Sequence, residues 1–406
     1  MSNALITPTM IAREALMQLD NNLVVAKTVY RDYDREYRAV GETINIRRPV
    51  DFTVTDGAAV DVQDVEEANF ALSMDKQKHV AWKFSTKDLT LTIEEYSERY
   101  IKPAMIQLAN QVDRDLLGLA TKFNNWVGTA GQDINAFTDF AKGPERLDVL
   151  AVPQGMRYAV LSPTDYWAFV SSQTSLNASD KLVESAYEQA RLGRVGGVEV
   201  LMAQNVQTLT CGTRDNTTPL TVGAQSTTYA AAKTNMTMNL NIDGLDASVT
   251  IEEGASFTIA DVFDVNPVTK VTLPHLKQFT VMAAKTAEAD GTCTLSIYPA
   301  IIPSGPYQNV SNAAANDKAI VFFGAASAAL RQNLIYHKNA MTLVTAPLYM
   351  PDGASFKAQE TDSSNGLSVR VIKDYDFNGD FERIRLDILY GVKTLDPRLG
   401  ARMSGT

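Results

Sequence analysis

The residue types that most often carry catalysis or bind metals are scarce in this chain and lie far apart. Its three histidines, His79, His275 and His337, fall in different segments, so no two of them have the spacing of a helical metal site. The two cysteines, Cys211 and Cys293, are too few for a disulfide framework or for a zinc site made of cysteines. The sequence therefore predicts no metal site and no cofactor.

The short catalytic and phosphate-binding motifs are absent as well. The chain contains no G-x-S-x-G, G-x-x-x-x-G-K-[ST] or G-x-G-x-x-G sequence. Gly193, Gly196 and Gly197 cluster after a predicted helix, where a C-cap and a turn explain them better than a phosphate cradle. Asp113 and Asp115 lie two positions apart on one predicted helix and do not share a face, so they cannot act together as acid and base. We predict that the protein is not an enzyme.

One segment resembles the start of a calcium-binding loop. Asp374-x-Asp376-x-Asn378-Gly379 has the spacing of an EF-hand, but Arg385 occupies the twelfth position, where a bidentate Glu belongs. The flanking stretches LSVRVIKDYDF and DFERIRLDILYG read as strands, and Asn-Gly is a strong signal for a two-residue turn. The sequence predicts a β-hairpin here rather than a calcium site.

Composition and charge restrict the class of protein. The chain has 406 residues, 45% of them hydrophobic and 21% charged, which excludes disordered and fibrous classes. Its formal net charge of −10 disfavours a protein that reads nucleic-acid sequence, because such proteins usually carry a basic excess. The start lacks the features of a signal peptide, and the best uncharged apolar run, 319–330, is shorter than the roughly 20 residues that span a bilayer. We expect a reducing cytoplasm, or an assembly formed there, and no membrane.

Residues 42–85 carry the clearest pattern in the chain. In TINIRRPVDFTV the apolar residues all fall at even-numbered positions, which place them on one face of a strand: Ile44, Ile46, Val50, Phe52 and Val54. The stretch 69–85 alternates in the same way, with Phe70, Leu72, Met74, Val80, Trp82 and Phe84 on one face. At about 3.3 Å per residue this second arm would extend roughly 50 Å, longer than usual strands. The apolar face of such a hairpin needs a cover, which either a neighbouring subunit or the protein's own core can supply.

Two amphipathic helices flank this hairpin. In residues 1–40 apolar residues recur four apart, at Ile11, Ala15, Leu19 and Leu23. Residues 92–124 predict a long helix, with a capping box formed by Thr92 and Glu95 and apolar residues three and four apart from Ile101 to Phe123. At 1.5 Å per residue this helix would be a rod of about 50 Å, with Pro103 as a candidate kink.

In the rest of the chain the predicted type of secondary structure changes twice. Strands at 157–162 and 196–203 alternate with helices that begin at Pro163 and Asp180, which is typical of α/β or α+β structure. From about Val206 the chain is rich in Thr, Val and Asn and forms short strands between turn residues, as in a small antiparallel barrel. The pattern of mixed helices and strands returns near Asp317, so the barrel is predicted to be an insertion into another domain.

Four arginines are candidate contact residues in this acidic chain: Arg47 and Arg48 at the base of the hairpin, and Arg398 and Arg402 in the tail. They either serve solubility or pair with acidic edges of adjacent subunits. Exposed ion pairs are typically worth less than about 1 kcal/mol, so such pairs would set register more than strength. The candidate intersubunit contacts are these arginines together with Phe70, Leu72, Met74 and Trp82.

The order of the parts, and four stretches of sequence, resemble a known family. The stretches are YIKPAMIQLANQVDRDLLG (100–118), FDVNPVTK (263–270) with HLKQFTV after it, NLIYHKNAMTLVTAPL (333–348) and RLDILYGVKTLDPRLGARM (385–403). The chain resembles the major capsid (coat) protein of tailed bacteriophages with the HK97 fold. The inserted barrel makes it similar to the P22 coat protein branch.

The resemblance implies an α+β fold with named parts along the chain. They are an N-terminal arm (1–41), an E-loop β-hairpin (42–90), a P-domain with a spine helix (91–150), a first A-domain part (151–205), an inserted β-barrel (206–318), a second A-domain part (319–345), and closing P-domain strands with a C-terminal tail (346–406).

The resemblance also implies a function. It implies hexamers and pentamers in an icosahedral phage head that encloses double-stranded DNA without sequence-specific binding. A scaffolding protein and a portal would be partners, with assembly in the host bacterial cytoplasm and a final place in the virion. Some shells of this fold form Lys–Asn crosslinks, and Lys76 and Lys78 lie on the hairpin, but no acid or acceptor can be assigned.

Three other functions stay open from the sequence. An encapsulin-like compartment of the same fold would hold an enzyme cargo instead of a genome. A cytoplasmic enzyme would need a site assembled from residues far apart in sequence, and the missing motifs disfavour it. The predicted long helix and the LYGVKTLDPRLG tail disfavour a virion decoration or tail protein.

Overall fold

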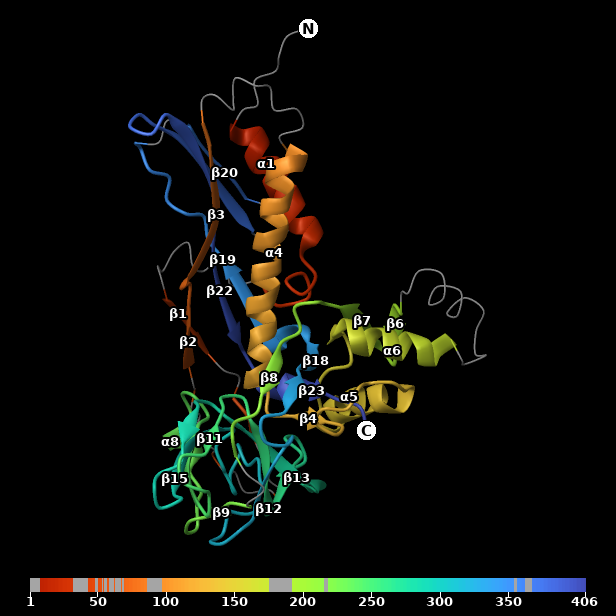
Figure 1. Cartoon of the computed structure of the whole chain (residues 1–406). Helices are drawn as coiled ribbons and strands as arrows, with labels where there is room; N and C mark the ends of the chain where they lie inside the picture. Colours follow the sequence, from red (N-terminus) through yellow and green to blue (C-terminus); the bar gives the residue numbers. More distant parts are fainter. Residues whose placement is uncertain are drawn as a thin grey trace. The chain divides into compact units, whose positions relative to one another are not determined.

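The computed structural model describes residues 8–31, 43–47, 50–52, 54, 57, 62, 67, 69–85, 97–174, 192–214, 218–353, 356–361 and 367–406. The chain divides into two compact units, and Figure 1 labels most of their elements. Unit 1 comprises residues 1–44, 71–117 and 341–393, and unit 2 comprises residues 45–70, 118–340 and 394–406.

Unit 1 is a β-sheet with two helices on one face (Figure 1). The sheet has the strand order β19-β22-β21-β20, and β3 also pairs with β22. The strands are β3 (Lys76–Ser85), β19 (Met341–Thr345), β20 (Phe356–Thr361), β21 (Ser368–Asp376) and β22 (Phe381–Thr394). The helices are α1 (Pro8–Asn22) and α4 (Lys102–Leu117), and a π-helical turn, η1 (Ser97–Ile101), leads into α4. The residues of β22 that alternate toward the helices, among them Leu386 and Ile388, are buried.

Both predicted helices are present. The stripe on α1 is confirmed, because Ile11, Ala15 and Leu19 are all buried. The long helix runs through η1 and α4 and ends in a 3-10 turn, η2 (Gly118–Lys122), which belongs to unit 2. Pro103 is the second residue of α4, directly after the π-helical turn. The predicted capping box, Thr92 and Glu95, lies outside the described residues.

The buried Asp113 of α4 anchors the chain that follows α1. Its Oδ2 accepts the amide of Val24 at 2.8 Å and its Oδ1 accepts the amide of Ala26 at 3.0 Å. Burial raises the pKa of Asp113, and these amides oppose that shift. Asp115 instead accepts a hydrogen bond of 2.8 Å from the Tyr390 hydroxyl. The two carboxylates therefore have different neighbours, as their spacing predicts.

The second arm of the predicted hairpin is two strands rather than one. β1 (Thr43–Arg47) and β2 (Asn69–Ser73) form a two-stranded sheet, and β3 begins only at Lys76. β3 then pairs antiparallel with β22 from Phe381↔Ser85 to Tyr390↔Lys76. The prediction of one continuous ribbon is therefore wrong. The break at residues 74–75 lets β3 join the sheet of unit 1, which satisfies its backbone and covers its apolar side.

The closing hairpin of β21 and β22 is confirmed, but its turn is longer than predicted. Asp376 pairs with Phe381, so residues 377–380 form a four-residue loop. The Asp376 carboxylate accepts the amides of Asn378 at 3.0 Å and Gly379 at 3.3 Å. The residue with positive φ is Asp380, at 49°, and not the glycine. The side chain of Asp376 thus stabilises a wider turn than the Asn-Gly pair alone predicts.

Unit 2 contains a six-stranded mixed sheet in the order β4-β23-β18-β5-β7-β6. Its strands are β4 (Trp126–Val127), β5 (Arg157–Leu161), β6 (Arg194–Val195), β7 (Val198–Met202), β18 (Asn333–His337) and β23 (Gly400–Met403). Its helices are α5 (Phe137–Val149) and α6 (Pro163–Thr174), with short 3-10 turns η3 (Lys338–Ala340) and η4 (Pro397–Leu399). The amide of Asp165 donates to Ser162 Oγ at 3.2 Å, which confirms Ser162 as the N-cap of α6. The predicted helix after Asp180 lies almost wholly outside the described residues.

The end of the chain completes this mixed sheet. β23 lies between β4 and β18, so residues 394–406 belong to unit 2 and not with the closing strands before them. Helix α5 packs closely on β23 at Gly143, where a Cβ would collide with Met403 Sδ. The sequence grouped both β4 and α5 with the spine helix, whereas the structure places them in unit 2.

The other large sheet of unit 2 is antiparallel and nearly closed, as predicted for the inserted barrel. Its strand order is β16-β12-β13-β15-β10-β9. The bridge Leu220↔Ala319 and the 2.9 Å bond from the Ile320 amide to the Pro219 carbonyl join its two edges. The elements of this region are β8 (Thr208–Thr210), β9 (Leu220–Thr221), α8 (Tyr229–Ala232), β10 (Met238–Asp243), β11 (Thr250–Ile251), β12 (Ser256–Val265), β13 (Thr272–Val281), β14 (Lys285–Thr286), β15 (Cys293–Tyr298), β16 (Ile320–Phe322) and β17 (Ala329–Arg331). Its core includes Leu240, Phe257, Phe279 and Ile297.

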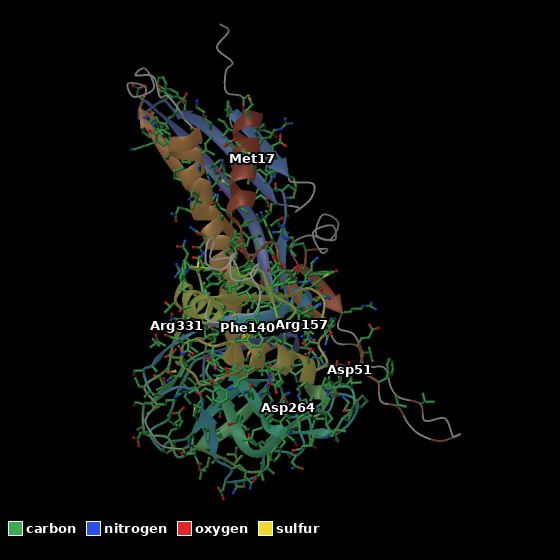
Figure 2. The ribbon with its side chains drawn as sticks, turned by 90° about the vertical axis from the view of Figure 1, so that its right-hand side faces the viewer. Met17, Asp51, Phe140, Arg157, Asp264 and Arg331 are labelled. Carbon is green, nitrogen blue, oxygen red and sulfur yellow. The ribbon has the colours of Figure 1, made fainter. Side chains whose placement is uncertain are left out.

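One carboxylate of the barrel, Asp264 (labelled in Figure 2), is buried beside two basic side chains. Lys277 Nζ donates to Asp264 Oδ1 at 2.8 Å, and His275 Nε2 lies 3.4 Å from Asp264 Oδ2. Burial alone would raise the pKa of Asp264, but Lys277 and His275 together lower it to about 2. Asp264 is therefore a charged partner in the folded state.

This lowered pKa predicts an acid-dependent loss of stability. Because the folded pKa lies below the ordinary value, Asp264 stabilises the fold above about pH 4 and loses that contribution as the pH falls toward 2. We expect the free energy of unfolding of the protein to fall by about 2 kcal/mol more than that of Asp264→Asn between about pH 5 and pH 2. Urea unfolding followed by tryptophan fluorescence across this range measures the difference. Equal pH dependence in the two proteins would contradict the assignment.

Candidate assembly surfaces

The predicted hairpin leaves part of its apolar face in solvent. Phe52 is 62% exposed, Val54 97% and Val62 81%. By contrast, Phe70 and Leu72 in β2 are 7% and 0% exposed. The apolar residues of the hairpin therefore form two groups, one covered by the chain itself and one open to a partner.

The first group corrects the prediction of intersubunit contacts. Because Phe70 and Leu72 are buried in their own chain, the expectation that a neighbouring copy covers them is wrong. Met74 and Trp82 are half-buried. Trp82 lies opposite Ile384 in the pairing of β3 with β22, on the face that the helices cover. The parity pattern identified these side chains as apolar and inward-facing, but it could not identify what lies on that side.

Two of the four predicted contact arginines form ion pairs within their own chain, and one lies outside the described residues. Arg47 Nη1 lies 3.0 Å from Glu67 Oε2, and both side chains are exposed. Arg398 pairs with Asp396 at 2.8 Å and with Asp51 at 3.4 Å. Arg48 is the one that is not described. Pairing of Arg47 and Arg398 with a neighbouring copy stays a prediction.

The Arg398 pair fixes the first arm of the hairpin within unit 2. Asp51, which Arg398 contacts, also donates its backbone amide to the Tyr307 hydroxyl at 3.2 Å. Tyr307 in turn stacks on Tyr229, with ring centroids 3.4 Å apart. The tail, the hairpin and the barrel region therefore meet at Asp51.

Arg402 is wholly buried, so its prediction as a surface contact is wrong. Its Nη1 donates to the Gly254 carbonyl at 2.7 Å and to Gln332 Oε1 at 3.1 Å. Its Nη2 donates to Thr280 Oγ1 at 2.9 Å and to the Ser256 hydroxyl. Burial lowers the pKa of Arg402, and these four acceptors take the place of water around the guanidinium.

A glycine makes one of these bonds possible. Gly254 has a φ of +87°, a conformation that residues with a Cβ rarely adopt. A Cβ there would also lie 2.7 Å from Thr121 Cβ. Gly254 therefore brings its carbonyl to Arg402 in a place where no larger residue fits.

The face of the unit 1 sheet away from its helices is rich in basic side chains. We call it the open face. By strand register it carries Lys83 and His79 on β3, Arg383 and Arg385 on β22, Arg370 on β21 and Lys357 on β20, against the carboxylates Asp374, Asp376 and Asp387. Arg370 and Arg385 both pair with Asp387, at 2.7 and 2.6 Å. The open face keeps a positive excess in a chain whose formal net charge is −10.

The chain also carries a segment of opposite charge. Residues 56–67 hold only acidic charged side chains, at Asp56, Asp61, Asp64, Glu66 and Glu67, with no Lys or Arg. This acidic segment belongs to the predicted hairpin, beside the exposed Phe52 and Val54 in sequence.

Large apolar side chains are also exposed outside the hairpin, at two turns and in the segment that follows β19. In unit 1, Phe377 in the β21–β22 turn is 88% exposed and Tyr349 is 76% exposed. In unit 2, Val268 is 72% exposed in the turn between β12 and β13. Single exposed apolar side chains are common on protein surfaces, so these three do not by themselves mark a contact surface.

No metal centre is found among the described residues. Within that part of the chain, no three His, Cys, Asp or Glu side chains come together as a metal site. No helix there is long and apolar enough to cross a membrane. Cys211 and Cys293 are free and buried.

Comparison with known proteins decides the family. The family model described as P22 coat protein, gene protein 5, matches residues 2–405. The chain belongs to the P22 coat protein family. The resemblance drawn from the sequence is thereby confirmed at the level of the family.

Two relatives support this assignment. The major capsid protein of Acyrthosiphon pisum secondary endosymbiont phage 1 is 24% identical over 294 residues, which cover 69% of this chain and 68% of that protein. A structure from Mycobacterium phage Che8 has a TM-score of 0.50 at 13% identity and covers 95% of this chain and 92% of that one. The α+β fold of this coat protein is therefore that of phage capsid proteins, as predicted.

The family assignment gives the function in outline. The chain is a structural protein, a major capsid subunit of a phage and thus a component of the virion. Capsid proteins of this kind assemble into multimeric shells. The surfaces above are accordingly candidates for contacts between copies of this coat protein.

The buried and the exposed hairpin residues predict unequal effects on the free energy of unfolding. Leu72→Ala should lower the free energy of unfolding by about 2–5 kcal/mol, because it opens a cavity in a buried site. Val54→Ala should change it by less than about 0.5 kcal/mol, because the side chain is in solvent. Urea unfolding of the unassembled subunit measures both values. Similar effects of the two substitutions would contradict this division.

Proposed function

We propose that the chain self-assembles into hexamers and pentamers of an icosahedral head that encloses double-stranded DNA without sequence-specific contacts. The match of the coat protein family over residues 2–405 carries this proposal. The exposed Phe52 and Val54 support it, because each would gain free energy from burial at about 25 cal/mol per Å² of apolar surface. A second copy of the chain is the partner that a closed shell supplies.

The partners proposed for assembly are a scaffolding protein and a portal, with assembly in the host bacterial cytoplasm. Membership of the chain in the P22 coat protein family supports this part of the proposal. The acidic balance of the chain supports loose enclosure of DNA, because a strongly basic lining would bind the genome to the wall.

In the proposed contact, the hairpin is the E-loop and lies over the neighbouring subunit. Its acidic segment, residues 56–67, faces the open face of the neighbour, which carries the opposite charge excess. Phe52 and Val54 are buried by the same contact. Each ion pair is weak, but symmetry repeats the set around every hexamer and pentamer.

The proposal of a DNA-filled head is tested on particles. Native particles purified from infected cells are imaged by negative-stain microscopy and assayed for nuclease-resistant DNA. Icosahedral shells that protect double-stranded DNA are expected. Shells that hold an enzyme cargo and no genome would favour an encapsulin-like compartment, and a monomer at high protein concentration would contradict self-assembly.

A charge swap tests the contact between the hairpin and the open face. Changing Asp61, Asp64 and Glu66 to Lys should leave a folded subunit that fails to form shells, because like charges then meet. Adding Lys83→Glu and Arg383→Glu should restore shells, because the complementarity returns with reversed sign. Sedimentation and negative-stain microscopy measure the yield of shells.

The matched control for this swap is Glu288→Lys, which reverses one exposed carboxylate on the barrel. It should leave the yield unchanged. If the reversed hairpin assembles as well as the parent, the acidic segment does not face the open face. If the hairpin variant fails and the swapped pair does not rescue it, the receiving surface lies elsewhere.

A further inference from the structure

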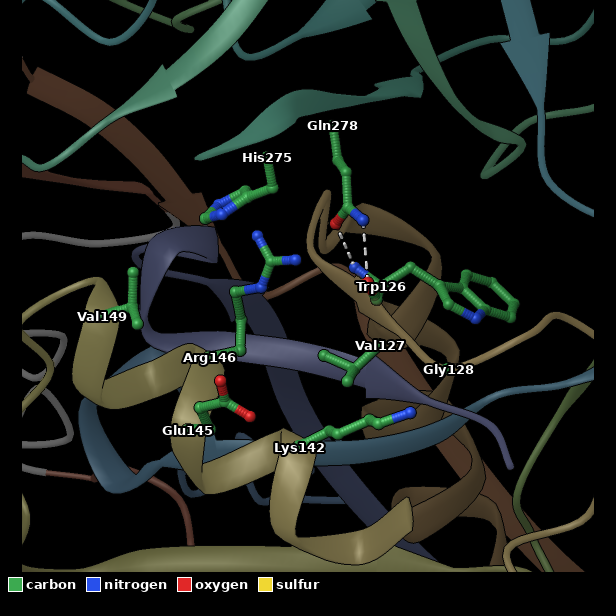
Figure 3. Close-up of a pocket in the computed structure, with 9 residues that line it drawn as sticks. All are labelled: Trp126, Val127, Gly128, Lys142, Glu145, Arg146, Val149, His275 and Gln278. Carbon is green, nitrogen blue, oxygen red and sulfur yellow. Dashed lines mark hydrogen bonds between the residues drawn. The ribbon is translucent and has the colours of Figure 1, made fainter. Parts of the chain in front are cut away.

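We propose that unit 2 carries a binding site for a phosphate-class oxyanion in the hollow between α5 and β13 (Figure 3). The hollow has a volume of about 410 Å³. Its lining is Trp126, Val127, Gly128, Lys142, Glu145, Arg146, Val149, His275 and Gln278. Neither the family nor the proposed shell assigns a function to this hollow.

Basic side chains reach the hollow from two elements. Lys142 and Arg146 are one turn apart on α5, and His275 comes from β13. Figure 3 shows Arg146 extended from the helix toward His275. Arg146 and His275 therefore point toward one another, and Lys142 lines the same polar space (Figure 3).

Among the described residues, one nitrogen of the half-buried Arg146 lacks a hydrogen-bond partner. Its Nη1 is buried and has no hydrogen-bond partner in the part of the chain that the structure describes. Burial lowers the pKa of Arg146, and the nearby carboxylates Asp264 and Glu145 only partly oppose this. A buried donor without an acceptor costs free energy, so an anion in the hollow would be stabilised by this group.

The carboxylates beside the hollow do not fill this role. Asp264 already accepts from Lys277 at 2.8 Å, and its other oxygen faces His275 at 3.4 Å. Glu145 is exposed to solvent. Both carboxylates act on Arg146 through their charge, but its Nη1 has no hydrogen bond among the described residues and remains available to a ligand.

The walls of the hollow are held in place before any ligand binds. Gln278 Oε1 accepts the Trp126 amide at 2.6 Å, and Gln278 Nε2 donates to the Trp126 carbonyl at 2.8 Å, as Figure 3 shows. Asn266 Nδ2 donates to the carbonyl of Val149, the last residue of α5, at 3.1 Å. Strand β4 and helix α5 are thus both fixed to the barrel, which reduces the cost of binding.

The arrangement suits a phosphate group better than a carboxylate. A carboxylate has two oxygens in one plane, which a single guanidinium can match. A phosphate or phosphomonoester has three or four oxygens in a tetrahedral arrangement and up to two negative charges near neutral pH. Donors that approach from both α5 and β13 match the tetrahedral arrangement of phosphate oxygens. The shared chemistry is that of inorganic phosphate and of the terminal phosphate of a nucleotide.

The site is tested on the full-length unassembled subunit, so its outcome does not depend on shell formation. Isothermal calorimetry with inorganic phosphate in a chloride-matched buffer should show saturable binding at around 1 mM. Arg146→Gln should weaken it about tenfold or more, because a charge-assisted hydrogen bond is lost. Lys285→Gln, on the exposed strand β14, is the matched control and should bind as the parent does.

The ligand-free stability separates binding from folding. Because Arg146 Nη1 makes no hydrogen bond, Arg146→Gln should melt at nearly the same temperature as the parent without phosphate. Phosphate should then raise the melting temperature of the parent and of Lys285→Gln, but much less that of Arg146→Gln. Equal shifts in all three proteins would overturn the site.

Further ligands distinguish the sources of the anion. A nucleoside monophosphate that binds more tightly than phosphate, while the nucleoside alone does not bind, assigns the site to a nucleotide phosphate. Equal binding of the two phosphates assigns it to the free oxyanion, and both results support the proposal. Absence of saturable phosphate binding, or tighter binding of acetate than of phosphate, would overturn it.

Discussion

One buried guanidinium connects the two large sheets of unit 2. Arg402 belongs to β23 in the mixed sheet, whereas Ser256 and Thr280 belong to β12 and β13 of the barrel. A buried charge that loses its partners costs several kcal/mol, so the mixed sheet is stable with Arg402 inside only when the barrel is folded against it. The barrel is an insertion in the sequence, but energetically it is part of the subunit core.

The same region connects the tail to the hairpin. The turn η4, just before β23, carries Arg398, which pairs with Asp51 of the first hairpin arm. Tyr307 holds the backbone of Asp51 from the barrel side. Unit 2 is therefore fixed internally before assembly, while Phe52, one residue further along, remains exposed for a partner.

Much of the fold could be predicted because periodicity reports which side of an element is buried. The stripe of α1, the long helix through Met105 and Leu116, and the closing hairpin all follow from local spacing. The turn at Asn378-Gly379 was predicted too short, because the capping carboxylate of Asp376 lies outside the dipeptide. The order of the parts and four stretches of sequence were together enough to identify the family.

The candidate contacts were harder to predict. Alternation of apolar residues along a strand shows that one face is buried, but it does not show whether the same chain or a neighbouring copy covers that face. Leu72 alternates as a residue that needs a cover, but the cover is its own chain. Arg402 looked like a surface charge, since its acceptors Gly254, Ser256 and Thr280 lie more than a hundred positions earlier in the sequence. The hollow beside Arg146 left no motif at all, because its lining comes from three separate segments.

Hydrogen exchange, measured by mass spectrometry on the unassembled subunit and on assembled shells, tests the central claim most directly. If copies of the chain complete a subunit that is already fixed by Arg402, peptides with Phe52 and Val54 should gain protection on assembly. Peptides from β12, β13 and β23 should exchange slowly in both states. Slow exchange around Phe52 in the lone subunit, or protection of β23 that appears only in shells, would contradict this account.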